Sequence, residues 1–307
     1  MRRLLLIAAS FWSLAGIAHP AHDAEPEASL NDAGLGTVIF PTSTRSAAAQ
    51  QEFLRGMLLL HLFEYPAAEA AFIQARTLDP SFAMAYWGEA MTFTHPLWNE
   101  QDVARGRAAL ARLAATATEQ AGKEGTPLER DWLALADLLY GEGEKVERDR
   151  RVLARLEDMN KRYPRNDEVE LFLSLWLMGV TQGERNVPNY LRAAKISREV
   201  YARNPAHPGA THYWIHGMDA PETAAGALEA ARVLARISPA AGHGQHMTSH
   251  IFSALGMWDD LVSANERAMA VVNAARAGRG QPPSYCGHYP EWLIYGYYQQ
   301  GRPQDAD

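Results

Sequence analysis

Cysteine is almost absent from this chain of 307 residues, which contains only Cys286. A single cysteine excludes an internal disulfide framework, a CxxC redox pair and a zinc site made of cysteines. The chain also lacks any run of Lys or Arg, and its formal net charge is −7. Because nucleic-acid binding requires a basic face, this charge balance argues against a nucleic-acid partner. GxGxxG, P-loop, GxSxG and HExxH motifs are absent too, so no such signature points to a reaction.

Long apolar runs are equally scarce, and the one present lies at the N-terminus. A pair of arginines precedes an apolar stretch over residues 4–17, and Gly16 and Ala18 supply the small residues that signal peptidase reads. We therefore predict a signal peptide over residues 1–18 and a periplasmic or secreted mature protein. The run is short for a membrane span and no second one follows, so no stable span is expected after cleavage. An uncleaved N-terminal anchor is the alternative.

Helical periodicity dominates the rest of the chain. Residues 19–44 are rich in Ala, Pro, Asp and Glu and are predicted to form a flexible lead-in. From there on, apolar residues recur with the spacing of helices. The expected helices span residues 46–63, 67–78, 82–94, 100–118, 127–140, 145–162, 167–181, 188–203, 209–218, 222–237, 243–255, 258–275 and 288–300. No stretch alternates with period two for long, so we expect an all-α fold with almost no strand.

The helices over residues 46–95 and 205–275 repeat at an interval of 34 residues, as Pro205 and Pro239 illustrate, whereas the repeats between them are longer and irregular. The small, packed and closing positions of a helix–turn–helix pattern are occupied by Gly56, Ala68, Phe72, Ala75 and Pro80. The pattern resembles the tetratricopeptide repeat (TPR) family, and that resemblance implies a helix–turn–helix superhelix, or α-solenoid. Residues 45–307 are accordingly expected to form one TPR-like domain whose last repeat is incomplete.

Histidines cluster in the C-terminal third, where seven of the eleven lie. His212 and His216 are four residues apart, as are His246 and His250, so each pair shares one helix face. The two pairs are themselves 34 residues apart and therefore occupy matched positions in successive repeats. The TPR resemblance implies that these positions line the concave groove. We predict that the four imidazoles converge on a transition-metal ion, with copper and zinc the foremost choices.

Further residues near these pairs can extend the site. The additional candidate ligands are His207, His243, His288 and Glu291. Asp219 and Glu222 are expected to orient imidazoles through hydrogen bonds to their second nitrogens. Met218 and Met247 lie beside the histidines and favour copper, because thioethers are soft ligands. A packing role stays open, since repeat duplication can copy a structural histidine.

A second set of residues is interpreted as a ligand-binding lining of the same groove. His61 and His95 are also 34 residues apart, and Trp87 lies between them in an aromatic segment. An aromatic and polar lining of this kind suits a peptide, a protein or a small molecule.

Two local strings are more distinctive than the repeat itself. Residues 207–216 read HPGATHYWIH, and residues 242–251 read GHGQHMTSHI. They resemble a His-rich group of exported bacterial TPR proteins, with the forms HPGxxHYxIH and GHxxHMxSHI, over most of residues 46–300. The resemblance implies kinship and assigns no activity.

The sequence thus favours an exported TPR-like protein that binds a transition metal through a histidine cluster in its concave groove. Whether it is a metal-dependent enzyme acting on a groove-bound ligand stays open. The alternative is a metal-free scaffold that binds a protein or peptide partner.

Overall fold

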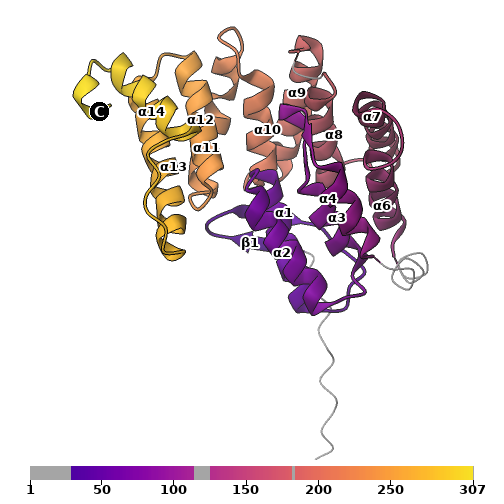
Figure 1. Ribbon diagram of the computed structural model, residues 1–307. Helices are drawn as coiled ribbons and strands as arrows, with labels where there is room; N and C mark the ends of the chain where they lie inside the picture. Colours follow the sequence, from indigo (N-terminus) through magenta and orange to yellow (C-terminus); the bar gives the residue numbers. More distant parts are fainter. Residues whose placement is uncertain (1–28, 114–124, 182–183, 307) are drawn as a thin grey trace, which may run out of the picture.

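The computed structural model describes residues 29–113, 125–181 and 184–306, and these form an all-α helical repeat solenoid (Figure 1). The prediction of an all-α fold is confirmed. The signal peptide predicted over residues 1–18 and the first part of the predicted lead-in lie outside the described residues. No helix in the described part of the chain combines the length and the apolar character that crossing a membrane requires.

Most observed helices follow the predicted ranges closely. The helix predicted over residues 100–118 is shorter, and its residues 114–118 lie outside the described part of the chain; the one predicted over 222–237 begins at Leu228 after a 3₁₀ turn. The observed helices are α1 (Ala47–His61), α2 (Tyr65–Leu78), α3 (Ala83–Met91), α4 (Val103–Ala111), α6 (Pro127–Leu139), α7 (Lys145–Arg162), α8 (Asp167–Gly179), α9 (Val187–Arg203), α10 (Pro208–Met218), α11 (Leu228–Ile237), α12 (Gly242–Ala254), α13 (Trp258–Gly278) and α14 (His288–Gln299). Short 3₁₀ turns lie at η1 (Pro96–Trp98), η2 (Ala224–Ala227) and η3 (Pro303–Asp305). Side-chain caps fix several starts. Thr126 and Glu129 form a reciprocal capping box at α6, which satisfies backbone N–H groups that the helix itself leaves free.

An antiparallel hairpin replaces part of the predicted flexible lead-in. Strand β1 (Ser29–Asp32) pairs with β2 (Gly36–Ile39), and β2 begins directly after the turn at Gly36, whose φ is 103°. Val38 and Phe40 point the same way and are buried in the core. Residues 29–44 are therefore not a flexible lead-in, because burial of these two side chains ties the segment to the helices. A second, smaller pair joins β3 (Thr94–His95) to β4 (Glu100–Gln101).

Successive helices pack against one another along the array, and the first pair also makes a long-range contact. Helix α1 lies against α10, so residues far apart in sequence meet at the centre of the molecule (Figure 1). The approach is close at Gly209, where an added Cβ atom would lie 2.6 Å from Nδ1 of His61. The face of α10 at Gly209 is therefore covered by α1.

Candidate metal centre

The structure divides the clustered histidines into two triads. The inner triad consists of His212 and His216 from α10 with His243 from α12. The outer triad consists of His246 and His250 from α12 with His288 from α14. Within each triad, one ring nitrogen per residue lies within 4.8 Å of the others. The four histidines predicted to share one site thus fall into two adjacent sets, and each i, i+4 pair gains a third imidazole from the helix two places further along the chain.

The relative positions of the helices explain this correction. The first turn of α12 places His243 opposite the α10 pair, with its ring 5.2 Å from that of His212 between centroids. One turn later, the other α12 histidines face α14, and the ring of His246 lies 4.5 Å from that of His288. The spacing of four fixes a shared helix face, but it does not fix which neighbouring helix that face meets.

Hydrogen bonds fix the ring protonation in the inner triad. His212 donates from Nδ1 to the backbone oxygen of His61 over 2.6 Å, so its Nε2 carries a lone pair. That lone pair lies 3.1 Å from Nε2 of His216. Burial lowers the pKa of His212 to about 3 and that of His216 well below its ordinary value. The imidazoles are therefore neutral, which is the form that binds metal ions.

In the outer triad, hydrogen bonds orient two of the three rings, those of His246 and His250. Asn265 donates its amide N–H to the backbone oxygen of Leu261, so its oxygen faces His246. His246 must therefore donate from Nδ1 to that oxygen, over 2.7 Å. His250 likewise donates from Nδ1 to the carboxylate of Asp219 over 2.8 Å, because an ionised carboxylate only accepts.

When both rings are neutral, the two Nε2 atoms of this pair both carry lone pairs. They belong to His246 and His250 and lie only 3.2 Å apart. Two lone pairs at that distance repel each other unless a cation lies between them. Burial lowers the pKa of His246 to about 3, so this ring is neutral near pH 7. A metal ion fits these nitrogens, and the exposed His288 completes a three-nitrogen set.

The residues that orient the imidazoles were predicted only in part. The expectation for Asp219 is confirmed by its bond to His250. Glu222, predicted to act in the same way, has no hydrogen bond to a histidine among the residues that the structure describes. Asn265 was missed, although an Asn in the middle of a helix is a poor helix former and signals a side-chain role. Trp292 was also missed, and its ring stacks on that of His250 at 4.4 Å.

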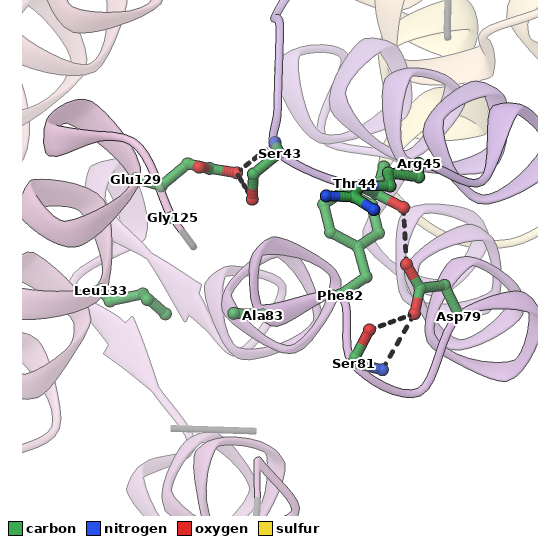
Figure 2. Close-up of a pocket in the computed structure, with 10 residues that line it drawn as sticks. All are labelled: Ser43, Thr44, Arg45, Asp79, Ser81, Phe82, Ala83, Gly125, Glu129 and Leu133. Carbon is green, nitrogen blue, oxygen red and sulfur yellow. Dashed lines mark hydrogen bonds between the residues drawn. The ribbon is translucent and has the colours of Figure 1, made fainter. Parts of the chain in front are cut away.

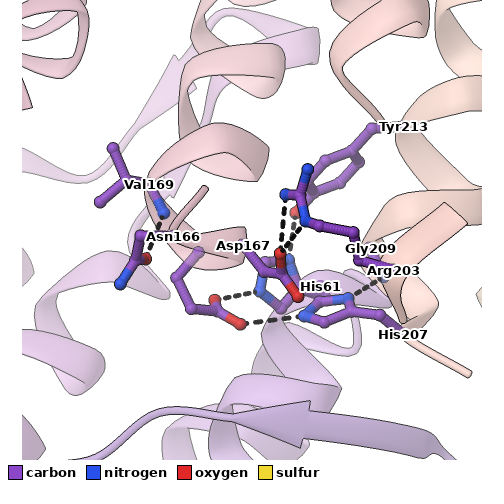
Figure 3. Close-up of polar contacts among 9 residues, drawn as sticks. His61, Asn166, Asp167, Val169, Arg203, His207, Gly209 and Tyr213 are labelled. Atoms are coloured by element: carbon purple, nitrogen blue, oxygen red, sulfur yellow. Dashed lines mark hydrogen bonds and ion pairs between the residues drawn. The ribbon is translucent and has the colours of Figure 1, made fainter. Parts of the chain in front are cut away.

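A third group contains His61, Glu168 and His207, all buried (Figure 3). Each histidine donates from Nε2 to one carboxylate oxygen of Glu168, over 2.7 Å and 2.9 Å. Each Nδ1 accepts a bond, from the hydroxyl of Tyr213 for His61 and from the backbone N–H of Gly209 for His207. Every ring nitrogen is therefore already used. This group is a structural hydrogen-bond network, not a free set of metal ligands.

The pKa shifts of Glu168 and His61 agree with a structural hydrogen-bond network. Burial opposes ionisation of Glu168, but the adjacent His61 and the hydrogen bonds from both imidazoles outweigh it and hold its pKa at about 2. Burial also lowers the pKa of His61, so that ring stays neutral and donates to the carboxylate. His207, a candidate ligand in the sequence, thus serves the network and caps α10.

The three residues predicted to line a ligand-binding groove, His61, Trp87 and His95, do not lie together in one groove. Trp87 is fully buried in an aromatic core, with its ring 5.3 Å from that of Trp132, so it does not line an open groove. His61 is buried in the network described above. Only His95 remains partly exposed, where it stacks on Tyr65 at 3.9 Å beside a hollow of about 800 Å³. Glu291 joins neither triad. Burial lowers the pKa of His288, and the charge of Glu291 offsets that effect only in part.

A separate hollow of about 270 Å³ lies between residues 43–45, the turn after α2 and the start of α6 (Figure 2). Ser43 donates from its backbone and its hydroxyl to Glu129, over 2.8 Å and 3.0 Å. The hydroxyls of Thr44 and Ser81 both donate to Asp79, each over 2.6 Å. These carboxylates therefore anchor the segment that leads into α1.

Comparison with models of known protein families gave no match, and comparison with curated proteins also gave none. The fold and the site define a class all the same: an all-α helical repeat protein with histidine groups positioned to hold a metal ion. The function is inferred from the geometry of those histidines.

Proposed function

We propose that this chain is an exported, TPR-like metalloprotein whose outer triad holds a transition-metal ion. The observation that carries the proposal is the 3.2 Å separation of Nε2 in His246 and His250, with both Nδ1 atoms committed as donors. Such a pair is preorganised for a cation, because hydrogen bonds already orient both rings and neither needs to turn when the ion binds.

The ligand chemistry favours copper or zinc. Imidazole nitrogen is a borderline ligand that suits both ions. Three imidazoles leave part of the coordination sphere open, as is typical of catalytic rather than purely structural zinc sites. His288 is exposed, so a small molecule can reach the ion from solvent. The bound ion can therefore act on a ligand, and metal-dependent catalysis is part of this proposal.

Metal analysis tests the proposal directly. The full chain is loaded with Zn²⁺ or Cu²⁺, dialysed, and assayed for bound metal beside the His250→Ala variant. We expect the wild type to retain metal and the variant to lose the outer ion. His95→Ala is the matched control, because His95 is a partly exposed histidine outside both triads. A wild type that retains no metal would support the alternative, a metal-free scaffold for a protein or peptide partner.

A further inference from the structure

The inner triad contains a polar atom that the surrounding protein leaves without a partner. Nε2 of His243 is buried and has no hydrogen bond among the described residues. An unsatisfied buried group of this kind costs about 1–3 kcal/mol and is rare in native proteins. Its Nδ1 has only a distant neighbour, the hydroxyl of Tyr289 at 3.5 Å. The ring therefore lies in the protein interior with its nitrogens essentially unused.

The other two rings of the triad supply the complementary donor atoms. Nε2 of His212 carries a lone pair, because its Nδ1 donates to the backbone of α1. Nε2 of His216 lies 3.1 Å from it, and a ring nitrogen of His243 lies within 4.8 Å of both. A proton on His216 can satisfy the bond to His212, but it leaves His243 without a partner. A metal ion uses all three nitrogens at once.

The two triads are adjacent because one helix contributes to both. His243 and His246 are three residues apart on α12, and their ring centroids are 6.2 Å apart. Tyr289 of α14 also spans the two sets, since its ring lies 4.7 Å from that of His246 and its hydroxyl approaches His243. Ions bound in the two triads would therefore be close neighbours.

We infer that the inner triad binds a second transition-metal ion, so that the loaded protein contains a two-ion centre joined through α12. This inference rests on the proposed function for the outer triad. The two positions differ in access. The inner triad is largely buried, with His212 wholly so, whereas the outer triad opens to solvent at His288. Mutual repulsion between two cations makes the second binding step weaker than the first.

Titration of the full chain with Cu²⁺ measures the number of ions. We expect two equivalents for the wild type, one for His216→Ala, one for His288→Ala and none for the double variant. His95→Ala should keep two, and circular dichroism confirms that each variant is folded. A single equivalent in the wild type, or two equivalents retained by His216→Ala, overturns the second site. A wild type that binds no copper instead removes the outer site and with it the proposed function.

Electron paramagnetic resonance of the wild type gives a readout that needs no mutation. Two neighbouring Cu²⁺ ions should produce a signal that is broadened or reduced by their magnetic interaction. The His288→Ala variant should show the sharp signal of one isolated ion. Sharp, full-intensity signals from two ions in the wild type would place the second ion elsewhere and contradict a centre joined through α12.

Discussion

The ring of Phe63 lies 4.4 Å from the imidazole of His212, measured between centroids. The same ring lies 5.8 Å from that of His216 and 5.5 Å from that of His243, so one side chain covers all three members of the inner triad. Phe63 has a backbone φ of 57°, in the left-handed region that bulky residues rarely adopt. Strain of this kind persists only where packing enforces it, and it is common beside functional sites.

Replacing Phe63 by Gly should change both the stability of the protein and the access of metal ions to the inner triad. The variant relieves the backbone strain but loses a buried aromatic ring, so we expect the free energy of unfolding to fall by about 2 kcal/mol. The inner triad should then take up its ion faster, because the ring that covers it is gone. Denaturant unfolding and stopped-flow copper loading measure the two effects. Unchanged loading would show that Phe63 does not limit access.

Asn265 fixes the proton on His246, and its removal should weaken the outer ion specifically. For Asn265→Ala we expect a loss of outer-triad affinity of about 10–100-fold, the usual effect of removing a residue that orients a metal-binding histidine. Asn273→Ala is the control, since Asn273 lies on the same helix and bonds to the backbone of Ser284 instead. Competition with a chelator of known affinity compares the two variants. Equal affinities would remove Asn265 from the site.

Glu168 should make the protein sensitive to acid in a defined range. Its pKa in the folded protein is about 2, below the ordinary value of 4.5, so the folded state favours the ionised form. The resulting stabilisation is complete above about pH 4.5 and is lost as the pH falls from there towards 2. Urea unfolding between pH 6 and pH 2 should show this loss in the wild type, and Glu168→Gln should show less of it. Parallel curves for both proteins would contradict the assignment.

The network around Glu168 should matter for stability and not for metal binding. In His207→Ala the carboxylate loses one of its two imidazole donors while remaining buried, so the free energy of unfolding should fall by about 2 kcal/mol. The number of bound copper ions should stay the same as in the wild type. Loss of an ion from this variant would instead make the network a metal site.

Much of the fold could be predicted from the sequence because the dominant signal is local. Helical periodicity, caps and the 34-residue recurrence gave helix ranges close to those observed. The hairpin at residues 29–39 was missed because its alternation is too short to stand out. Its order depends on burial of Val38 and Phe40 against helices distant in sequence.

The candidate site was predictable in its residues but not in its grouping. The spacing of His212 from His216 shows that they share a face, yet the offset between α10 and α12 decides which third ring joins them. The contact of α1 with α10 is also invisible in local patterns, and it is this contact that withdraws His61 into the core. The grouping of the histidines and the burial of His61 therefore depend on long-range packing, which sequence periodicity does not reveal.

Metal content of the purified full chain tests the central claim most directly. After loading with Cu²⁺ or Zn²⁺ and dialysis against metal-free buffer, the wild type should retain about two equivalents, because each triad presents imidazole nitrogens that are already grouped. The variant that combines His216→Ala with His288→Ala should retain none while remaining helical. A wild type that retains no metal under these conditions would contradict the account and make the histidines structural.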